Sequence, residues 1–332
     1  MVAIALAGAF ALTNGFHDAS NAIATLVATR GATPGQAVAL AAVFNMAGAL
    51  LLGTAVADTI ATIVELPADE TVTAVGAGLA GATVWNVVTW WRGLPSSSGH
   101  ALVGGLVGAA LVEGGPDAVL WGGFEGWHPV GVLGTLVALI TSPFVGLALG
   151  YVLLRLFRRL ARRWTTAWRR PMTGAGWVAS AGLSYSHGAN DAQKAMGVIA
   201  ALLLAGGVSD ELTVPLWAKV LTGLALTLGT ALGGWRIVRT VGRRIFPLTP
   251  MDSVSSQVAS TAVIYTASVI GAPVSTTQVV ASSVVGVGGG RRRWGHVRWE
   301  VVRDMLLAWL TTIPAAGALA AAILLVWRGV AG

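Results

Sequence analysis

The sequence alternates long apolar stretches with short polar loops. About 20 helical residues are needed to span the roughly 30 Å hydrocarbon core of a bilayer. Eight apolar stretches are long enough, at residues 1–29, 36–62, 71–91, 130–154, 174–205, 212–235, 252–271 and 304–327. Two shorter pieces, 96–112 and 274–289, are rich in glycine and in serine or other small residues, and each follows a proline. That combination is typical of re-entrant or broken helices, so the pattern predicts an all-α integral membrane protein.

Two of the apolar stretches contain charged and amide side chains that lipid would not tolerate. Residues 14–21 read Asn-Gly-Phe-His-Asp-Ala-Ser-Asn, and residues 186–194 read Ser-His-Gly-Ala-Asn-Asp-Ala-Gln-Lys. A shift of 173 positions superposes Asp18 on Asp191, which indicates a duplicated chain. An aspartate in the middle of a span costs at least about 2.5 kcal/mol to insert, so each one is a candidate functional residue. Lys194 shares a helical face with Asp191, so a structural ion pair is the alternative there.

Composition and charge support membrane insertion. Hydrophobic residues make up 55% of the chain and charged residues 11%, which is too apolar for a soluble domain. The net charge of +7 is concentrated in a few loops, which indicates orientation in a membrane and not nucleic-acid binding. Basic residues cluster at 155–170, 236–244 and 291–303, and acidic residues at 65–70, 113–125 and 210–211. If each segment crosses once, all basic loops are cytoplasmic and both termini lie outside an inner (cell) membrane.

This topology divides the chain into two halves of opposite orientation. An odd number of crossings in each half inverts the second copy relative to the first. We therefore expect a first inverted repeat at 1–154, an Arg-rich cytoplasmic loop at 155–173 and a second inverted repeat at 174–332. Inverted repeats of about five segments, with helices broken at mid-membrane, are typical of secondary transporters, whose substrates bind between the repeats.

Each half carries a second motif after its third span. It reads Leu-Pro-Ser-Ser-Ser-Gly-His at 94–100 and Ala-Pro-Val-Ser-Thr-Thr-Gln at 272–278. Proline followed by hydroxyl residues predicts a helix start, where free N–H groups and the positive dipole end favour an anion. The alternative is that these hydroxyls bond to their own helices. The expected substrate-binding residues are Asp18, Asn21, Ser97, Ser98, Asn190, Asp191, Ser275, Thr276 and Thr277.

An anion beside two carboxylates needs accompanying cations. At an effective dielectric of 20, like charges 4 Å apart repel by about 4 kcal/mol. Carbonyls freed by a break at Gly15 could form a Na⁺ site with Asp18, Asn14 and Asn21. We therefore assign Asp18 and Asn21 to ion coupling.

The second half differs in its charge balance. Lys194 occupies the place of Asn21, so a fixed ammonium beside Asp191 stands where the first half could hold a mobile ion. Protons remain an alternative coupling ion, since carboxylates and the histidines can carry them at depth. The histidines in these motifs are His17, His100 and His187.

At these positions the chain resembles the PiT family of inorganic phosphate transporters. The family's duplicated signature, commonly Gly-Ala-Asn-Asp-Val-Ala-Asn-Ala, is similar to residues 15–22 and 188–195. The family's Pro-x-Ser-Thr/Ser-Thr/Ser pattern is similar to residues 95–98 and 273–277. The resemblance implies an inverted-repeat fold that holds phosphate between re-entrant helix starts and two broken, aspartate-bearing helices.

The chain also departs from the signature. His17 stands where the family often has Asn, and Gln193 and Lys194 replace small and amide residues. This Asn-Asp-x-Gln-Lys form looks like the bacterial low-affinity branch, which is associated with proton-coupled uptake of metal-phosphate complexes. The resemblance therefore implies uptake by proton or sodium symport, with a divalent metal as a candidate companion of phosphate and no bound cofactor.

Other functions remain open at this point. A sulfate transporter of the same family fits equally well, because both anions are tetrahedral and accept hydrogen bonds. An intramembrane enzyme would need one activated serine and a differently placed base, whereas these hydroxyls are clustered and symmetric. The expected partners are inorganic phosphate, the lipid bilayer and, in a homodimer, a second copy of the chain. No nucleic acid is expected.

Overall fold

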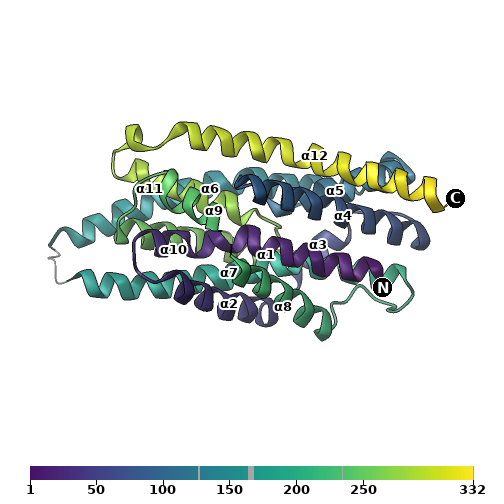
Figure 1. Cartoon of the computed structure of the whole chain (residues 1–332), viewed down its shortest axis with the longest axis horizontal. Coiled ribbons are helices and arrows are strands. Elements are labelled where there is room, and N and C mark those ends of the chain that lie inside the picture. The colour runs from purple at the N-terminus through teal and green to yellow at the C-terminus, as the bar shows by residue number, and fades with distance from the viewer. Residues whose placement is uncertain (126–127, 164–167, 234, 332) are drawn as a thin grey trace.

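The computed structural model is a bundle of long helices that run along one common axis (Figure 1). Its backbone is described for residues 1–125, 128–163, 168–233 and 235–331. Side chains are also left out of the description at 19–21, 125, 128, 163, 169–170, 235–236 and 331. The helices are α1 (Val2–Ala28), α2 (Pro34–Leu51), α3 (Ala55–Ala61), α4 (Ala68–Arg92), α5 (Ser98–Gly114), α6 (Gly131–Leu160), α7 (Arg169–Ala205), α8 (Leu216–Leu232), α9 (Trp235–Arg239), α10 (Pro250–Val269), α11 (Thr276–Gly290) and α12 (Trp299–Ala331).

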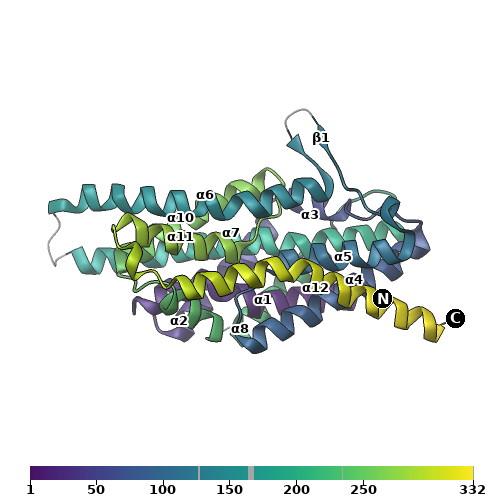
Figure 2. The same cartoon turned by 90° about the horizontal axis from the view of Figure 1, so that it is seen from above.

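Short elements connect these helices. Two strands, β1 (Phe124–Glu125) and β2 (His128–Pro129), form an antiparallel hairpin that protrudes from the bundle (Figure 2). Single turns of 3-10 helix lie at Pro116–Ala118, Ala161–Arg163 and Trp294–His296, and a π-helical turn lies at Thr240–Arg244. Helices thus enter the predicted Arg-rich loop 155–173 from both sides, through the end of α6 and the start of α7.

The two ends of the bundle carry opposite charge, as the loop composition predicts. The N- and C-termini lie at one end, and the end of α6 and the start of α7 lie at the other (Figure 1). At the first end Arg328 forms an ion pair with Glu113. At the second end arginines from α6 and from the turn after α11 line a common cavity.

Four of the described helices qualify as membrane spans by length and composition, namely α2, α4, α6 and α12. A fifth span is formed if α8 is joined to residues 237–244, which are bent by 71° relative to it. The protein is therefore an all-helical membrane protein with several apolar spans and one broken helix. Helices α1 and α7 are long enough to span, but they contain the buried polar segments.

Helices α5 and α11 each begin inside the bundle. Each returns to the end of the bundle at which the preceding helix, α4 or α10, starts. Gly114 at the end of α5 lies beside Leu66, just before α4. Likewise Arg291, just after α11, forms an ion pair with Asp252 in the first turn of α10 at 2.8 Å. The pairs α4–α5 and α10–α11 are therefore hairpins, which agrees with the re-entrant helices expected at 96–112 and 274–289.

The predicted break at Gly15 is wrong, and so is the matching break near Asp191. Both α1 and α7 are continuous helices. The glycines there allow close helix contact: a Cβ on Gly15 would lie 2.2 Å from the Leu226 carbonyl oxygen of α8, and one on Gly188 would lie 2.1 Å from that of Asn45 in α2. Gly15 and Gly188 therefore serve packing between helices.

The helix expected at 36–62 is instead broken. It is split into α2 and α3 by residues 52–54. The first turn of α3 has a free backbone N–H at Val56, which donates to Oε1 of Gln193 at 2.8 Å. The break is therefore stabilised by a side chain of α7, which a pattern within 36–62 could not reveal.

Candidate functional site

Helices α1 and α7 run in opposite directions through the middle of the bundle. Trp177 near the start of α7 donates to the carbonyl of Gly31 after α1, at 2.9 Å. Ser180, one turn further on, donates to the carbonyl of Ala22 at 2.9 Å. This crossing buries both motif aspartates, with Asp18 at 2% and Asp191 at 1% exposure.

The carboxylate of Asp18 accepts hydrogen bonds from both hairpins. Thr277 of α11 donates to its Oδ1 at 2.7 Å, and the hydroxyl of Ser98 in α5 contacts its Oδ2. Nδ1 of His17 lies 2.8 Å from Oδ1, so this nitrogen carries a proton when Asp18 is ionised. The opposite nitrogen of His17 lies 3.1 Å from each of the hydroxyls of Thr89 and Ser96.

The carboxylate of Asp191 has a hydroxyl, an imidazole and an ammonium around it. Thr276 of α11 donates to its Oδ2 at 2.8 Å, and Nε2 of His187 lies 2.9 Å from the same oxygen. Lys194 forms an ion pair with Oδ1 and donates to the carbonyl of Val274 at 2.8 Å. The ion pair that the sequence suggested between Lys194 and Asp191 is therefore present.

The two hairpin starts repeat the same arrangement. Ser98 in the first half and Thr276 in the second each follow the residue that caps the helix, and each binds the aspartate of its own half. Thr277 adds a bond from the second half to Asp18, whereas the equivalent position in the first half is Gly99. A Cβ on Gly99 would lie 3.2 Å from Nζ of Lys194, so this glycine leaves room for the ammonium.

Two of the serines expected in the site, Ser97 and Ser275, cap their own helices. The hydroxyl of Ser97 accepts from the backbone N–H of His100 at 3.2 Å. The hydroxyl of Ser275 accepts from that of Gln278 at 3.3 Å. In the described structure neither serine bonds an aspartate, and each begins a helix, α5 or α11.

Some buried polar atoms near the aspartates have no protein partner among the described residues. They are Nδ2 of Asn14, Nδ1 of His100, Oδ1 of Asn190 and Oε1 of Gln278. Asn190 uses its amide nitrogen to bond Ser268 at 3.1 Å. Because an unpaired buried group costs about 1–3 kcal/mol, the polar groups of this region are suited to a further polar ligand.

The side chain of Asn21, expected to bind both anion and sodium, lies outside the described residues. The sequence did not predict several residues that bond the site histidines or support those that do. They are Thr89, which contacts His17, and Asn45 and Thr230, which are linked to His187. Asn45 bonds Nδ1 of His187 at 3.1 Å and donates to Thr230 at 3.1 Å. Its position in an otherwise apolar span was the available signal.

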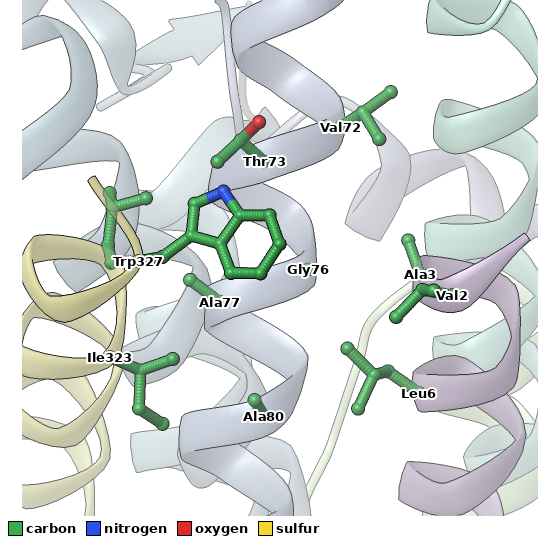
Figure 3. A pocket seen from close by; sticks show the side chains of 11 residues that line it. Val2, Ala3, Leu6, Val72, Thr73, Gly76, Ala77, Ala80, Ile323 and Trp327 are labelled. Atoms are coloured by element: carbon green, nitrogen blue, oxygen red, sulfur yellow. The ribbon is translucent and has the colours of Figure 1, made fainter. Parts of the chain in front are cut away.

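A separate, apolar pocket does not include the site around Asp18 and Asp191. It has a volume of about 280 Å³ and lies between the start of α1, the first half of α4 and the end of α12 (Figure 3). Leu6, Ile323 and Trp327 face it, and Thr73 contributes its one lining hydroxyl. Such a lining suits lipid chains, whereas the buried polar site lies deeper between α1 and α7.

Two buried carboxylates, an ammonium and hydroxyls on two facing hairpins, all inside a helical membrane bundle, are typical of a membrane transporter. The sequence pattern of the phosphate transporter family matches residues 14–175 and again residues 166–320. The chain belongs to this family, and the double match indicates an internal repeat. It is a multi-pass transporter of the plasma membrane, of the bacterial type.

Individual relatives support this assignment. The chain is 40% identical over 320 residues to a probable low-affinity inorganic phosphate transporter of Rhizobium meliloti, covering 96% of this chain and 93% of the relative. It is 38% identical over 317 residues to one of Bacillus subtilis, covering 94% and 92%. A solved structure described as the sodium-dependent phosphate transporter has the same fold, with a TM-score of 0.87, 24% identity and 98% of both chains covered.

Proposed function

We propose that this chain takes up inorganic phosphate by cation symport, through two inverted repeats that hold the anion between α5 and α11. The relatives named as low-affinity phosphate transporters align over almost their full length. One observation carries the anion site: hydroxyls at both hairpin starts, Ser98, Thr276 and Thr277, donate to oxyanions that the protein itself supplies. A phosphate oxygen is the same kind of acceptor, so phosphate can take over these donors.

The inverted repeats are supported by matched helix contacts. Helix α1 packs on α8 through Gly15 and Gly229, and α7 packs on α2 through Gly188 and Gly48. Gly15 and Gly188 are 173 positions apart, the same shift that relates the aspartates. Because α1 and α7 run in opposite directions, the operation that relates the halves inverts them across the membrane.

The proton is the coupling cation in this proposal. Thr230 donates to the Leu226 carbonyl at 2.8 Å, so its oxygen accepts from the Asn45 amide nitrogen, which leaves the Asn45 oxygen facing Nδ1 of His187. Nδ1 therefore carries a proton, while Nε2 lies 2.9 Å from the Asp191 carboxylate and makes no hydrogen bond in the described structure. A second proton between Nε2 and Asp191 removes the repulsion between these two acceptors.

Phosphate entry brings further negative charge to this region, and the extra proton and Lys194 lower its cost. Two like charges 4 Å apart repel by about 4 kcal/mol at a dielectric of 20. A divalent metal carried with phosphate would reduce the charge of the anion in the same way. Sodium, which the solved relative's description names, is the alternative ion for the Asp18 half.

Transport in proteoliposomes tests the proposal. Radiolabelled phosphate and sulfate are offered separately under an imposed proton gradient or an imposed sodium gradient. We expect phosphate uptake driven by the proton gradient, little uptake of sulfate, loss of phosphate uptake in Asp18→Asn and normal phosphate uptake in the exposed control Asp58→Asn. His187→Gln should lose the proton dependence, whereas the exposed control His296→Gln should keep it. Uptake of sulfate in preference to phosphate would overturn the assignment of the substrate. Uptake driven by sodium alone would overturn proton coupling.

A further inference from the structure

Six arginines from two distant parts of the chain line one cavity at the basic end of the bundle. The cavity has a volume of about 380 Å³. The lining arginines are Arg155, Arg158, Arg159, Arg162, Arg291 and Arg292. Arg155, Arg158 and Arg159 lie on one face of the last turns of α6. Arg162 lies in the 3-10 turn that follows α6. We call this cavity the arginine pocket.

The arginine pocket carries a large excess of positive charge. Asp252 neutralises Arg291 at 2.8 Å, and Arg155 is occupied by Tyr151, whose ring lies 5.3 Å from the guanidinium. In the described part of the chain, no acidic side chain forms an ion pair with the other four arginines. Membrane orientation requires basic residues at this end, but it does not require them to converge on one cavity. Converging guanidinium groups attract a multiply charged oxyanion.

The backbone at Arg292 points to the same role. Its φ is 57°, in the left-handed region, and its N–H donates to the Gly289 carbonyl at 2.7 Å. A left-handed residue one position beyond a helix cap, as Arg292 is beyond Arg291, is usually glycine, because a side chain there costs about 1 kcal/mol or more. An arginine at a strained position that lines a cationic cavity indicates that its side chain has a function.

We propose that the arginine pocket binds a phosphate-bearing anion, either a soluble polyphosphate or the headgroup of an anionic phospholipid. The volume accommodates more than one phosphate group. Helices α6 and α11 meet at this pocket and lie side by side (Figure 2). They pack so closely that a Cβ on Gly150 would lie 2.4 Å from the Ser283 carbonyl oxygen. A bound anion therefore joins the last turn of α6 to the end of α11, whose start holds both site aspartates.

The test uses two pairs of variants of the full-length protein. Arg159→Gln with Arg292→Gln removes two charges from the pocket. Arg243→Gln with Arg244→Gln is the matched control, because both arginines are exposed and do not line the pocket. Binding of tripolyphosphate is measured by calorimetry in neutral detergent, and retention of phosphatidylglycerol is measured by native mass spectrometry.

We expect the pocket pair to weaken binding of one ligand by about tenfold or more, the effect of losing a charge-assisted hydrogen bond, while the control pair binds as the parent does. An effect on tripolyphosphate identifies a soluble ligand, and an effect on phosphatidylglycerol identifies a lipid headgroup. A single variant, Arg292→Gly, should bind more weakly and yet unfold at a higher temperature, because glycine relieves the left-handed strain. Equal effects of the pocket and control pairs on both ligands would overturn the proposal.

Discussion

Replacement of Lys194 by Asn tests how the site balances its charge. The ammonium is 1% exposed, forms an ion pair with Asp191 and donates to the Val274 carbonyl at 2.8 Å. Asparagine is the residue of the equivalent position in the first half, Asn21. Lys194→Asn therefore removes a fixed charge and places an uncharged side chain of the type already present in the other half.

The expected loss of phosphate uptake is large, because the substitution leaves the buried Asp191 carboxylate without its cation. Breaking a buried ion pair by removing one partner costs about 3–5 kcal/mol. An incoming phosphate then meets Asp191 uncompensated, and repulsion of about 4 kcal/mol corresponds to nearly three orders of magnitude in affinity. A proton on Asp191 removes both costs, so uptake by the variant should be very low at neutral pH and should recover as the external pH falls.

The assay is the initial rate of radiolabelled phosphate uptake into proteoliposomes, measured against external pH and against sodium. Lys219→Asn is the matched control, since Lys219 lies in the first turn of α8 and forms no ion pair among the described residues. The control should follow the parent at every pH. If Lys194→Asn shows the parent's rate with the parent's pH and sodium dependence, Lys194 takes no part in charge balance and the reasoning is refuted.

Three further outcomes are expected. Ser98→Ala should weaken phosphate affinity by about ten- to a hundredfold, whereas Ser97→Ala should mainly lower thermal stability, by about 1 kcal/mol for a lost helix cap; equal affinity losses would contradict the separate roles. Gly188→Ala should destabilise the protein strongly in thermal unfolding, because its Cβ would lie 2.1 Å from a backbone oxygen, while Gly8→Ala, with nothing within 4 Å, should be neutral or slightly stabilising. A cysteine at Arg162, in a chain that has no other cysteine, should react with a membrane-impermeant reagent only after the cells are opened, and labelling of intact cells would reverse the orientation.

Much of the fold follows from local pattern. Most helix ranges are set by runs of apolar residues, and the two hairpin starts are set by proline and hydroxyl residues, so these were predictable, whereas the split of 36–62 into α2 and α3 was not. The Lys194–Asp191 pair was also predictable, because residues three apart share a helical face. These features depend on neighbours in the sequence.

The remaining features depend on contacts between distant segments. Thr277 and Asp18 are 259 positions apart, and no periodicity links them. A glycine beside a polar motif is compatible with a helix break or with close helix packing, and only the neighbouring Leu226 carbonyl shows that Gly15 serves packing. Ser97 and Ser98 look equivalent in sequence, but Ser97 is the extended residue before α5 and Ser98 is the first helical residue, so Ser97 caps the helix and Ser98 reaches Asp18.

The two hairpins differ in the number of site aspartates to which their starts bond. Withdrawal of the start of α11 breaks the bonds of Thr276 to Asp191 and of Thr277 to Asp18 in a single movement. Withdrawal of the start of α5 breaks the bonds of Ser98 to Asp18 and to Asn14, both on α1, and in the described structure it breaks none to Asp191. Movement of α11 would therefore change the hydrogen bonding of both site aspartates together, whereas movement of α5 would change that of Asp18 alone.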